Sequence, residues 1–345
     1  MIKIEKIGPD DFETWDHFVE MMDEASFHHQ IRWRKFIETM YGKWLTPIYL
    51  MARNGSEVEG ILPLFVFCHW FFGKKLISVP FSSQAGCCAR TDLAANSLIK
   101  KAIEITKELN LDYLELRNLY NYKMNELVTD KSYFTLKLDL ENNFDTLQKK
   151  FRSTTRRYVR RSKENDLVFD MFSDNIEDFY KIYSIGQRNL GTPTQGYKWL
   201  KTLYSSFKEN HSVVQVQYKG KLVAAILLRI YKDTVTYVIG SSLPEYRHLY
   251  SNYLLFGELL KYYCEKGYHY FDFGRSIENS GSYYFKRGWG AQPIQFYYQY
   301  HLEKTKKITS TSQVNPKRIL FAKLWKRFPL SLSEILGPII RRYYP

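Results

Sequence analysis

Apolar and polar side chains alternate in many short segments of this chain, and a period of two residues predicts half-buried β-strands. Between them lie longer stretches in which apolar side chains recur every three or four residues, which indicates amphipathic helices. The predicted strands of the first half are residues 2–7, 47–53, 58–68, 75–79, 112–117 and 133–140. Those of the second half are residues 167–172, 213–218, 222–231, 234–239 and 269–273. Strands mixed with helices in this way predict an α/β chain with mixed sheets.

The order of the predicted elements repeats in the two halves. A predicted helix precedes the strand 112–117 in the first half, and another precedes the strand 269–273 in the second. The two strands carry an acid at equivalent points, Glu115 and Asp272, 157 positions apart. An internal duplication of one α/β unit explains helix, strand and acid together. Convergent patterning of two unrelated segments is the alternative.

The clearest candidate for a functional site is the stretch over residues 267–293. Its pattern predicts a strand that ends at Gly274, a polar turn over 275–281 and a cluster of aromatic and basic side chains over 283–287. An acid at the end of a strand, a polar loop and a cation among rings are the parts of a substrate cleft in an α/β fold. An ordinary strand–loop–strand with a structural ion pair accounts for the same residues.

A long helix is predicted over residues 144–163, and its second part is strongly basic. From Lys149 to Lys163 the chain holds eight basic residues and no acid. Such a run is either a solvated helix face or a binding face for phosphate groups, whose oxygens match arginine forks. The absence of any acid favours phosphate binding. A further helix over 176–189 is followed by Gly191, which can form its C-cap, and Arg188 in its last turn can also lie at the mouth of a cleft.

The net charge of +14 is concentrated in two places. Residues 149–163 contribute +8 and residues 304–345 contribute +9, so the rest of the chain is slightly acidic. Local basicity of this kind predicts anionic partners at two sites rather than a generally cationic surface. Aromatic residues make up 17% of the chain, and they serve mainly to fill cores, although rings also line sugar and peptide clefts.

Other features bound the compartment and the cofactors. No apolar run approaches the roughly 20 residues of a membrane-spanning helix, and the N-terminus lacks the apolar segment of a signal peptide. The four cysteines include no C-x-x-C pair, which fits a reducing cytoplasm. The eight histidines show no metal-ligand spacing, so no metal site is expected.

The basic C-terminal tail is predicted to contain a helix that begins at Pro316 and ends at Pro329. Its apolar residues share one face, opposite the basic ones, and they are Leu320, Phe321, Leu324, Trp325 and Phe328. Such a helix either lies on an anionic membrane surface or packs its apolar side on the folded body.

The sequence DFGRS at 272–276, followed by SGSYYFKRGWGAQP at 280–293, resembles the closing motif of the FemAB family, in particular its members associated with envelope and exopolysaccharide (PEP-CTERM-type) systems. Weaker matches are FHHQ-x-x-W at 27–33, PFSSQAG at 80–86, FRSTTRRYVRR at 151–161 and RNLGTP at 188–193. The resemblance implies a tandem duplicated GNAT-like acyltransferase fold. Its first domain would be residues 1–143, its second, with the active site, 144–303, and its basic amphipathic tail 304–345.

The same resemblance implies roles for individual residues. Lys286 with Phe285 matches the family's Phe-Lys pair near the reacting ester, where a fixed ammonium stabilises the oxyanion that forms when an amine attacks. Asp272 would orient or deprotonate that amine, unless it forms only a structural ion pair. The implied substrate-binding residues are Arg275, Tyr284, Trp33, Ser82 and Arg188. The implied binding residues for phosphate groups or tRNA are Arg156, Arg157, Arg160 and Arg161.

We therefore expect a cytoplasmic N-acyltransferase of FemAB type that forms an amide bond on an amine of a cell-envelope glycan, peptidoglycan or exopolysaccharide precursor. Its donor would be aminoacyl-tRNA or acyl-CoA, with no tightly bound cofactor. Its partners would be tRNA, CoA or a lipid-linked glycan precursor rather than DNA, and contact of the tail with the inner face of the membrane stays open.

Two alternatives compete with this reading. The first is an acyl-CoA-dependent GNAT acetyltransferase with a degenerate cofactor loop, because residues 241–252, where the phosphate loop of such enzymes is expected, contain no glycine. The second is a non-catalytic module that binds RNA or a glycolipid, for which the basic helix and the many rings would suffice.

Overall fold

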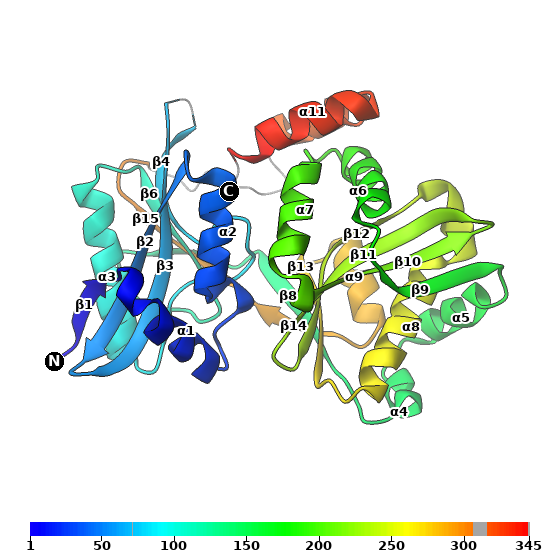
Figure 1. The fold of residues 1–345 in the computed structure, drawn as a ribbon, viewed down its shortest axis with the longest axis horizontal. Helices are drawn as coiled ribbons and strands as arrows, with labels where there is room; N and C mark the ends of the chain where they lie inside the picture. The colour runs from blue at the N-terminus through cyan, green and yellow to red at the C-terminus, as the bar shows by residue number, and fades with distance from the viewer. Residues whose placement is uncertain (71, 306–315, 344–345) are drawn as a thin grey trace. The chain divides into compact units, whose positions relative to one another are not determined.

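The computed structural model describes the whole chain except residues 71, 306–315 and 344–345. The chain divides into two compact units. Unit 1 consists of residues 1–133 together with 295–305, and unit 2 of residues 134–294 together with 316–343. Each unit is built on one mixed sheet with helices on both faces (Figure 1), which confirms the predicted α/β fold class. Among the described residues, no helix combines the length and apolarity needed to cross a bilayer.

The sheet of unit 1 runs in the order β1-β2-β3-β4-β6-β15-β7, and β5 pairs with β3 off this path. Its strands are β1 (Lys3–Lys6), β2 (Leu45–Asn54), β3 (Glu57–His69), β4 (Gly73–Ser78), β5 (Cys88–Ala89), β6 (Tyr113–Asn118), β7 (Val128–Asp130) and β15 (Tyr297–Leu302). Helix α3 (Asp92–Glu108) covers one face through an aliphatic cluster, and α1 (Phe12–Met21) and α2 (Ile31–Tyr41) cover the other (Figure 1).

The sheet of unit 2 runs in the order β14-β8-β13-β12-β11-β10-β9. Its strands are β8 (Tyr133–Asp139), β9 (Leu167–Ser173), β10 (His211–Tyr218), β11 (Lys221–Tyr231), β12 (Thr234–Ser242), β13 (Tyr270–Ile277) and β14 (Gln292–Gln295). Helices α8 (Ser251–Glu265) and α5 (Ser153–Ser162) lie on one face, where α8 packs on an aliphatic and aromatic core. Helix α6 (Ile176–Leu190) crosses β11 and β12 on the other face, next to α7 (Tyr197–Ser206) (Figure 1).

The same strand–helix–strand step occurs once in each unit. Helix α3 connects β4 to the parallel strand β6, and α8 connects β12 to the parallel strand β13. Each ladder has three residue pairs, and the last is Ile77↔Glu115 in unit 1 and Thr236↔Asp272 in unit 2. The structure thus places the two acids that the sequence aligned at the same step of the same ladder.

One strand in each sheet comes from an unexpected part of the sequence. Strand β15, which follows all of the second repeat, pairs with β6 and β7 in the sheet of unit 1. Strand β8, which follows the first repeat, lies between β13 and β14 in the sheet of unit 2. The alternation of side chains predicted β8, over residues 133–140, but not the sheet that it joins.

Several predicted boundaries were wrong. The helix predicted over 144–163 is two helices, α4 (Phe144–Lys149) and α5, and the backbone N–H of Arg152 between them donates to the carbonyl of Gly288 at 2.9 Å. The strand predicted to end at Gly274 continues to Ile277, and the aromatic-basic cluster lies on a helix, α9 (Gly281–Gly288). The tail has two described helices, α10 (Pro316–Trp325) and the unpredicted α11 (Leu330–Arg341).

Candidate active site

Strands β12 and β13 separate beyond Asp272. Their parallel pairing ends at Thr236↔Asp272, although β12 continues to Ser242 and β13 to Ile277. At Gly274 the backbone has a φ of +72°, and a Cβ atom built there would lie 3.0 Å from the carbonyl oxygen of Tyr237. A residue without a side chain is favoured at such a position. The glycine therefore lets β13 turn away from β12 just after the acid.

Asp272 lies at the end of a polar row across the sheet. His211, Arg229, Thr236 and Asp272 are consecutive register partners on β10, β11, β12 and β13, so their side chains share one face. The preceding residues on β11, β12 and β13 (Leu228, Val235 and Phe271) are buried in the core of the opposite face. The polar row thus lies on the face of the sheet that α6 crosses.

Hydrogen bonds fix the carboxylate of Asp272. Its Oδ1 accepts one from the hydroxyl of Thr135 on β8 and one from the backbone N–H of Gly274 at 2.7 Å. Burial lowers the pKa of Arg229 to about 10, while the charge of Asp272 acts to raise it. Arg229 therefore stays protonated at neutral pH and places a positive charge near Asp272.

Lys286 reaches back from α9 to the strand that carries Asp272. Helix α9 begins after Ser280, whose hydroxyl oxygen accepts from the N–H of Tyr283 at 3.2 Å as an N-cap. Lys286 is only 8% exposed, and its Nζ donates to the carbonyl oxygens of Gly274 at 2.9 Å and Arg275 at 3.1 Å. These bonds use two of the three N–H groups of the ammonium.

The environment of Lys286 changes its basicity. Burial lowers its pKa to about 8, while the carboxylate of Asp272 acts to raise it and the Arg275 guanidinium to lower it further. At neutral pH the side chain is still mostly an ammonium, but it can exchange its proton near physiological pH. A buried lysine with a lowered pKa near a carboxylate held by hydrogen bonds marks a candidate catalytic site.

The other residues that the resemblance implied for this site lie at its rim or in the core. Phe285 packs with the rings of Tyr253 and Trp289 in the core, with centroid distances of 5.5 and 6.2 Å. Arg275 is exposed, and the hydroxyl of Tyr284 donates to Asn279 Oδ1 at 2.7 Å. Among the implied residues, Asp272 and Arg275 are the charged groups that act on Lys286.

Arg188 lies in the last turn of α6 in unit 2, whereas Trp33 and Ser82 belong to unit 1. Arg188 donates to Oδ1 of its neighbour Asn189 at 3.0 Å, just before Gly191, which has a φ of +77° and ends α6 as predicted. Trp33 is 2% exposed and packs on Phe36, and the hydroxyl of Ser82 donates to the carbonyl of Val79 at 2.8 Å. A substrate would have to displace packed side chains to reach Trp33.

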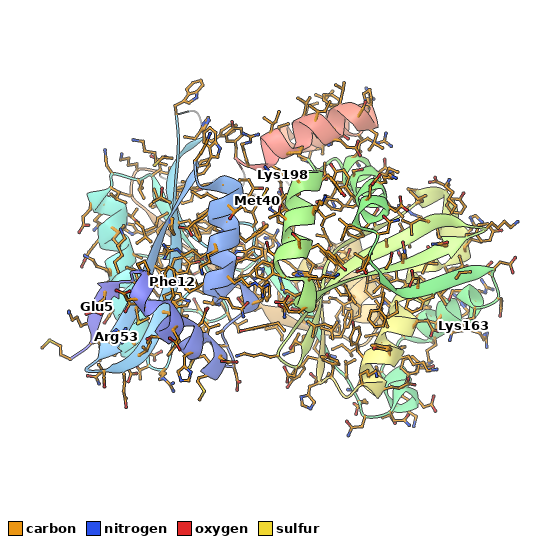
Figure 2. All side chains as sticks on the ribbon, in the orientation of Figure 1. Glu5, Phe12, Met40, Arg53, Lys163 and Lys198 are labelled. Atoms are coloured by element: carbon orange, nitrogen blue, oxygen red, sulfur yellow. The ribbon has the colours of Figure 1, made fainter. Side chains whose placement is uncertain are left out.

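The four arginines implied to bind phosphate all lie exposed on α5, which packs beside α8. Lys163 lies just past the end of α5 (Figure 2). It forms an ion pair with Glu258 of α8 at 2.6 Å. Arg161 Nη1 lies 3.4 Å from the hydroxyl of Tyr250, and the rings of Tyr158 and Tyr250 stack at 4.8 Å. Tyr250 has a φ of +58° and precedes the first turn of α8 without a side-chain cap.

The basic face of α5 is therefore adjacent to the N-terminus of α8, where the positive end of a helix dipole attracts anions. Two of the arginines have other contacts as well. Arg156 Nη1 donates to the carbonyl of Phe151 at 2.5 Å, and the Arg157 guanidinium lies 5.2 Å from the ring centre of Tyr158. Arg160 is exposed in the last turn of α5.

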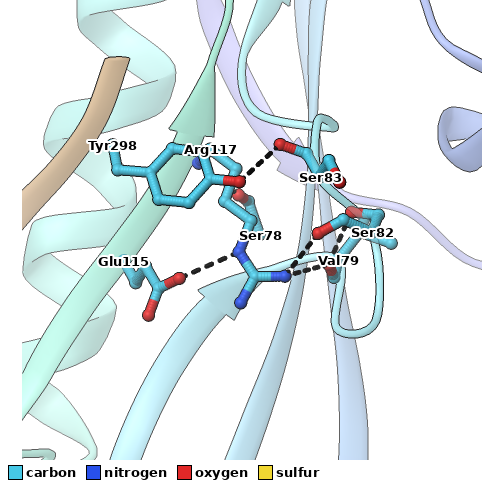
Figure 3. Close-up of polar contacts among 7 residues, drawn as sticks. All are labelled: Ser78, Val79, Ser82, Ser83, Glu115, Arg117 and Tyr298. Atoms are coloured by element: carbon cyan, nitrogen blue, oxygen red, sulfur yellow. Dashed lines mark hydrogen bonds and ion pairs between the residues drawn. The ribbon is translucent and has the colours of Figure 1, made fainter. Parts of the chain in front are cut away.

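The equivalent place in unit 1 is filled by a closed ion pair (Figure 3). Glu115 Oε1 accepts from Arg117 Nε at 2.8 Å, and Nη1 of Arg117 donates to the carbonyl of Ser82 at 2.6 Å. The hydroxyl of Tyr298 on β15 donates to the carbonyl of Ser83 at 2.8 Å. These bonds hold the loop after β4 against β6 and β15.

Sequence analysis missed Thr135 and Arg229. The sequence around Arg229 could have pointed to it, because this charged residue lies inside the apolar run of residues 222–231. A charge in such a run is expected to have a partner. Nothing in the sequence pointed to Thr135, because threonine is common in alternating strands. No group of three or more His, Cys, Asp or Glu residues suited to a metal was found among the described residues.

Comparisons with known proteins agree with this fold. Residues 149–287 match the family described as Acetyltransferase (GNAT) domain. FemX has 13% identity and a TM-score of 0.64, and the match covers 88% of this chain and 98% of FemX. A tandem GNAT protein from the clavulanic acid biosynthesis pathway has 9% identity, a TM-score of 0.56 and coverage of 89% and 100%.

L-PGS from Bacillus licheniformis has 14% identity, a TM-score of 0.52 and coverage of 94% and 99%. No curated protein sequence matches the chain. At these identities the structural likeness establishes the fold. The tandem GNAT fold that the resemblance implied is thereby confirmed, whereas the envelope-associated branch stays a prediction.

Proposed function

We propose that this chain, which has a tandem GNAT fold, is an acyltransferase that forms amide bonds on an amine of a cell-envelope glycan or peptide precursor. The reacting groups would meet in unit 2, beside Asp272 and Lys286. The observation that carries this proposal is the position of Lys286 Nζ, which donates to the carbonyls of Gly274 and Arg275, two and three residues after Asp272.

The chemistry of amide formation suits this pair of groups. The acceptor amine attacks the acyl carbon of an ester or thioester, a C–N bond forms, and the carbonyl oxygen becomes an oxyanion. The ammonium of Lys286, which is largely buried, stabilises that oxyanion. Asp272 orients the amine and accepts its proton, and the bond to the donor oxygen or sulfur then breaks, with a proton passing to the leaving group.

The donor is an anion that binds along α5. Four exposed arginines beside the N-terminus of α8 provide forks for phosphate oxygens. The segment before α8 lacks the glycines that let a backbone close tightly around a pyrophosphate. A large donor that contacts the arginines over a wide surface, as aminoacyl-tRNA would, fits this arrangement.

Acetyl transfer from acetyl-CoA is the second candidate. The family match, which is described as an acetyltransferase domain, includes α5 and all of α9 but its last residue, and so favours it. The envelope acceptor is supported by the resemblance of the closing motif to FemAB proteins and by the fold shared with FemX. A cytoplasmic location, where charged tRNA and CoA are both present, belongs to the same proposal.

The test measures amide formation on amino sugars and on lysine-containing peptides with two donors, charged tRNA and acetyl-CoA. Lys286→Met keeps the side-chain length without the charge, and we expect it to lower kcat about 10²- to 10³-fold with the productive donor. Lys261→Met removes an exposed lysine of α8 and serves as the matched control.

Turnover with only one donor identifies that donor. Equal rates in wild type and Lys286→Met would contradict the proposed role of Lys286. No turnover with either donor, together with RNA or glycolipid binding that survives the substitution, would replace the enzyme by a binding module.

A further inference from the structure

The two tail helices pack on unit 2 through their small residues. In α11, Ser333 is 1% exposed, and Glu334 accepts a hydrogen bond from the hydroxyl of Ser184 on α6 at 2.6 Å. A Cβ atom built on Gly337 would lie 2.9 Å from the backbone nitrogen of Thr194, so the helix backbone lies directly on the segment after α6. Figure 1 shows α11 across the ends of α6 and α7.

Helix α10 packs on the same segment. A Cβ atom built on Gly191 would lie 2.7 Å from Cβ of Ala322, and Trp325 is 2% exposed. Trp325 stacks on Phe321 and Phe328 with centroid distances of 5.4 and 5.3 Å. The apolar face predicted for this helix is therefore divided, because Trp325 faces the protein while Leu320 and Leu324 face solvent.

Large aliphatic side chains point away from unit 2 on both helices. Leu320 and Leu324 of α10 are 60% and 52% exposed, and Ile335 of α11 is 61% exposed. Leu332 and Ile339 lie one turn before and after Ile335, and both are more than 40% exposed. A helix that packs only on its own domain places such residues inward and small polar ones outward. Here α11 does the reverse.

Positive charge accompanies these aliphatic residues. Lys323, Lys326 and Arg327 are exposed on and just after α10, and Arg341 and Arg342 follow at the end of α11. The single acid of the tail, Glu334, is bonded to Ser184 on the inward side. The outward surface therefore combines aliphatic side chains with cations and lacks an acid among the described residues of the tail.

We propose that this outward surface of α10 and α11 docks on an anionic lipid bilayer. Aliphatic side chains that enter the acyl region, with flanking cations at the headgroups, are the features of a helix that lies in a membrane interface. The comparison with α5 distinguishes this partner from a dissolved polyanion. Helix α5 is just as basic, but none of its residues is among the exposed large hydrophobic residues of the described chain.

Vesicle co-sedimentation of the full chain tests the proposal. We expect binding to vesicles of phosphatidylcholine with about 30% phosphatidylglycerol and much weaker binding to phosphatidylcholine alone. The triple variant Leu332→Ser/Ile335→Ser/Ile339→Ser is expected to lower the partition coefficient at least about tenfold. Lys323→Gln/Arg327→Gln is expected to lower it about fivefold per charge, and added salt is expected to lower it as well.

Two control variants separate this surface from others. Val168→Ser/Leu93→Ser removes equally exposed aliphatic side chains elsewhere, and Arg157→Gln/Arg160→Gln removes two charges from α5. Both are expected to bind vesicles like the wild type. Circular dichroism and thermal unfolding show whether each variant is folded. If the serine variant is unfolded, the charge variant, which retains all aliphatic contacts, still tests the proposal.

Absence of binding to the anionic vesicles would overturn the proposal, and so would wild-type binding by both tail variants. Concentration-dependent self-association that the serine substitutions abolish, without vesicle binding, would assign the surface to a protein contact instead. Because the readout is lipid binding, the result is independent of donor, acceptor and turnover.

Discussion

The two parallel ladders of this protein both end at an acidic residue, but the surroundings of the two acids differ. Glu115 and Asp272 both occupy the third and last pair of their ladder. Two residues further along the strand, unit 1 has Arg117 and unit 2 has Gly274. Arg117 pairs with the acid of its own strand, whereas Gly274 has no side chain and a φ of +72°. The cations near Asp272 come instead from other elements, Lys286 from α9 and Arg229 from β11.

This difference separates a structural ion pair in unit 1 from the proposed reactive site in unit 2. The Glu115–Arg117 pair is closed, because its side chains are 13% and 9% exposed and Arg117 also binds the carbonyl of Ser82. Lys286 binds backbone carbonyls rather than Asp272 directly, so both charges can turn to a substrate. The two units thus share the same strand–helix–strand step. They differ in the residue two positions after the acid, which is Arg117 in unit 1 and Gly274 in unit 2.

Opening the closed pair in unit 1 is expected to have the largest effect on stability. Arg117→Met leaves a buried carboxylate and a carbonyl without their partner, and we expect a loss of about 3–5 kcal/mol in the free energy of unfolding. Urea unfolding measures it. Glu115→Leu/Arg117→Met should recover much of the loss, and a loss below about 1 kcal/mol in the single variant would contradict the closed-pair description.

The pH dependence of transfer tests whether the cation of unit 2 is reactive. Burial lowers the pKa of Lys286 from its ordinary 10.5 to about 8, so the ammonium is present below pH 8 and is lost above it. We therefore expect kcat to fall about tenfold per pH unit above that pKa. Lys286→Arg retains its proton throughout and should lack this falling limb. A falling limb in both proteins would assign it to another group.

The glycine of unit 2 is expected to have a smaller effect. Gly274→Ala introduces a Cβ atom at positive φ, 3.0 Å from the carbonyl of Tyr237. We expect a loss of about 1–2 kcal/mol in the free energy of unfolding and a lower rate of transfer, because β13 must shift where Lys286 binds it. Gly281→Ala, where nothing lies within 4 Å, is the control. Equal stability of the two variants would show that the turn of β13 does not require glycine.

The smallest effect is expected at the hydroxyl that holds Asp272. Thr135→Val keeps the shape of the side chain and removes one hydrogen bond to the carboxylate. We expect kcat to fall about three- to tenfold with little change in KM. This fall corresponds to the net free energy of about one hydrogen bond. Thr39→Val removes an exposed hydroxyl bond in unit 1 and should leave kcat unchanged. A change confined to KM would show that Thr135 acts on substrate binding.

Sequence patterns located much of the candidate site. The alternation around Glu115 and Asp272 predicted two equivalent strands, and the ladder register confirms that equivalence. The motif after Asp272 singled out Lys286, whose burial and hydrogen bonds the structure then describes. These features were predictable because alternation and helix spacing depend on residues that are close together in the chain.

Other features depended on contacts between distant parts of the chain. The pairing of β15 with β6, the contact of Thr135 with Asp272 and the packing of Gly337 on Thr194 each join segments more than 100 residues apart. Local periodicity states which face of a strand or helix is apolar, but not which neighbour covers that face. The sequence by itself therefore determined the repeated α/β unit, its two acids and its basic segments. Only the tertiary structure decided that one acid is closed in an ion pair, that the other lies near a buried lysine, and that the tail turns its aliphatic side chains outward, because those outcomes depend on which distant elements pack together.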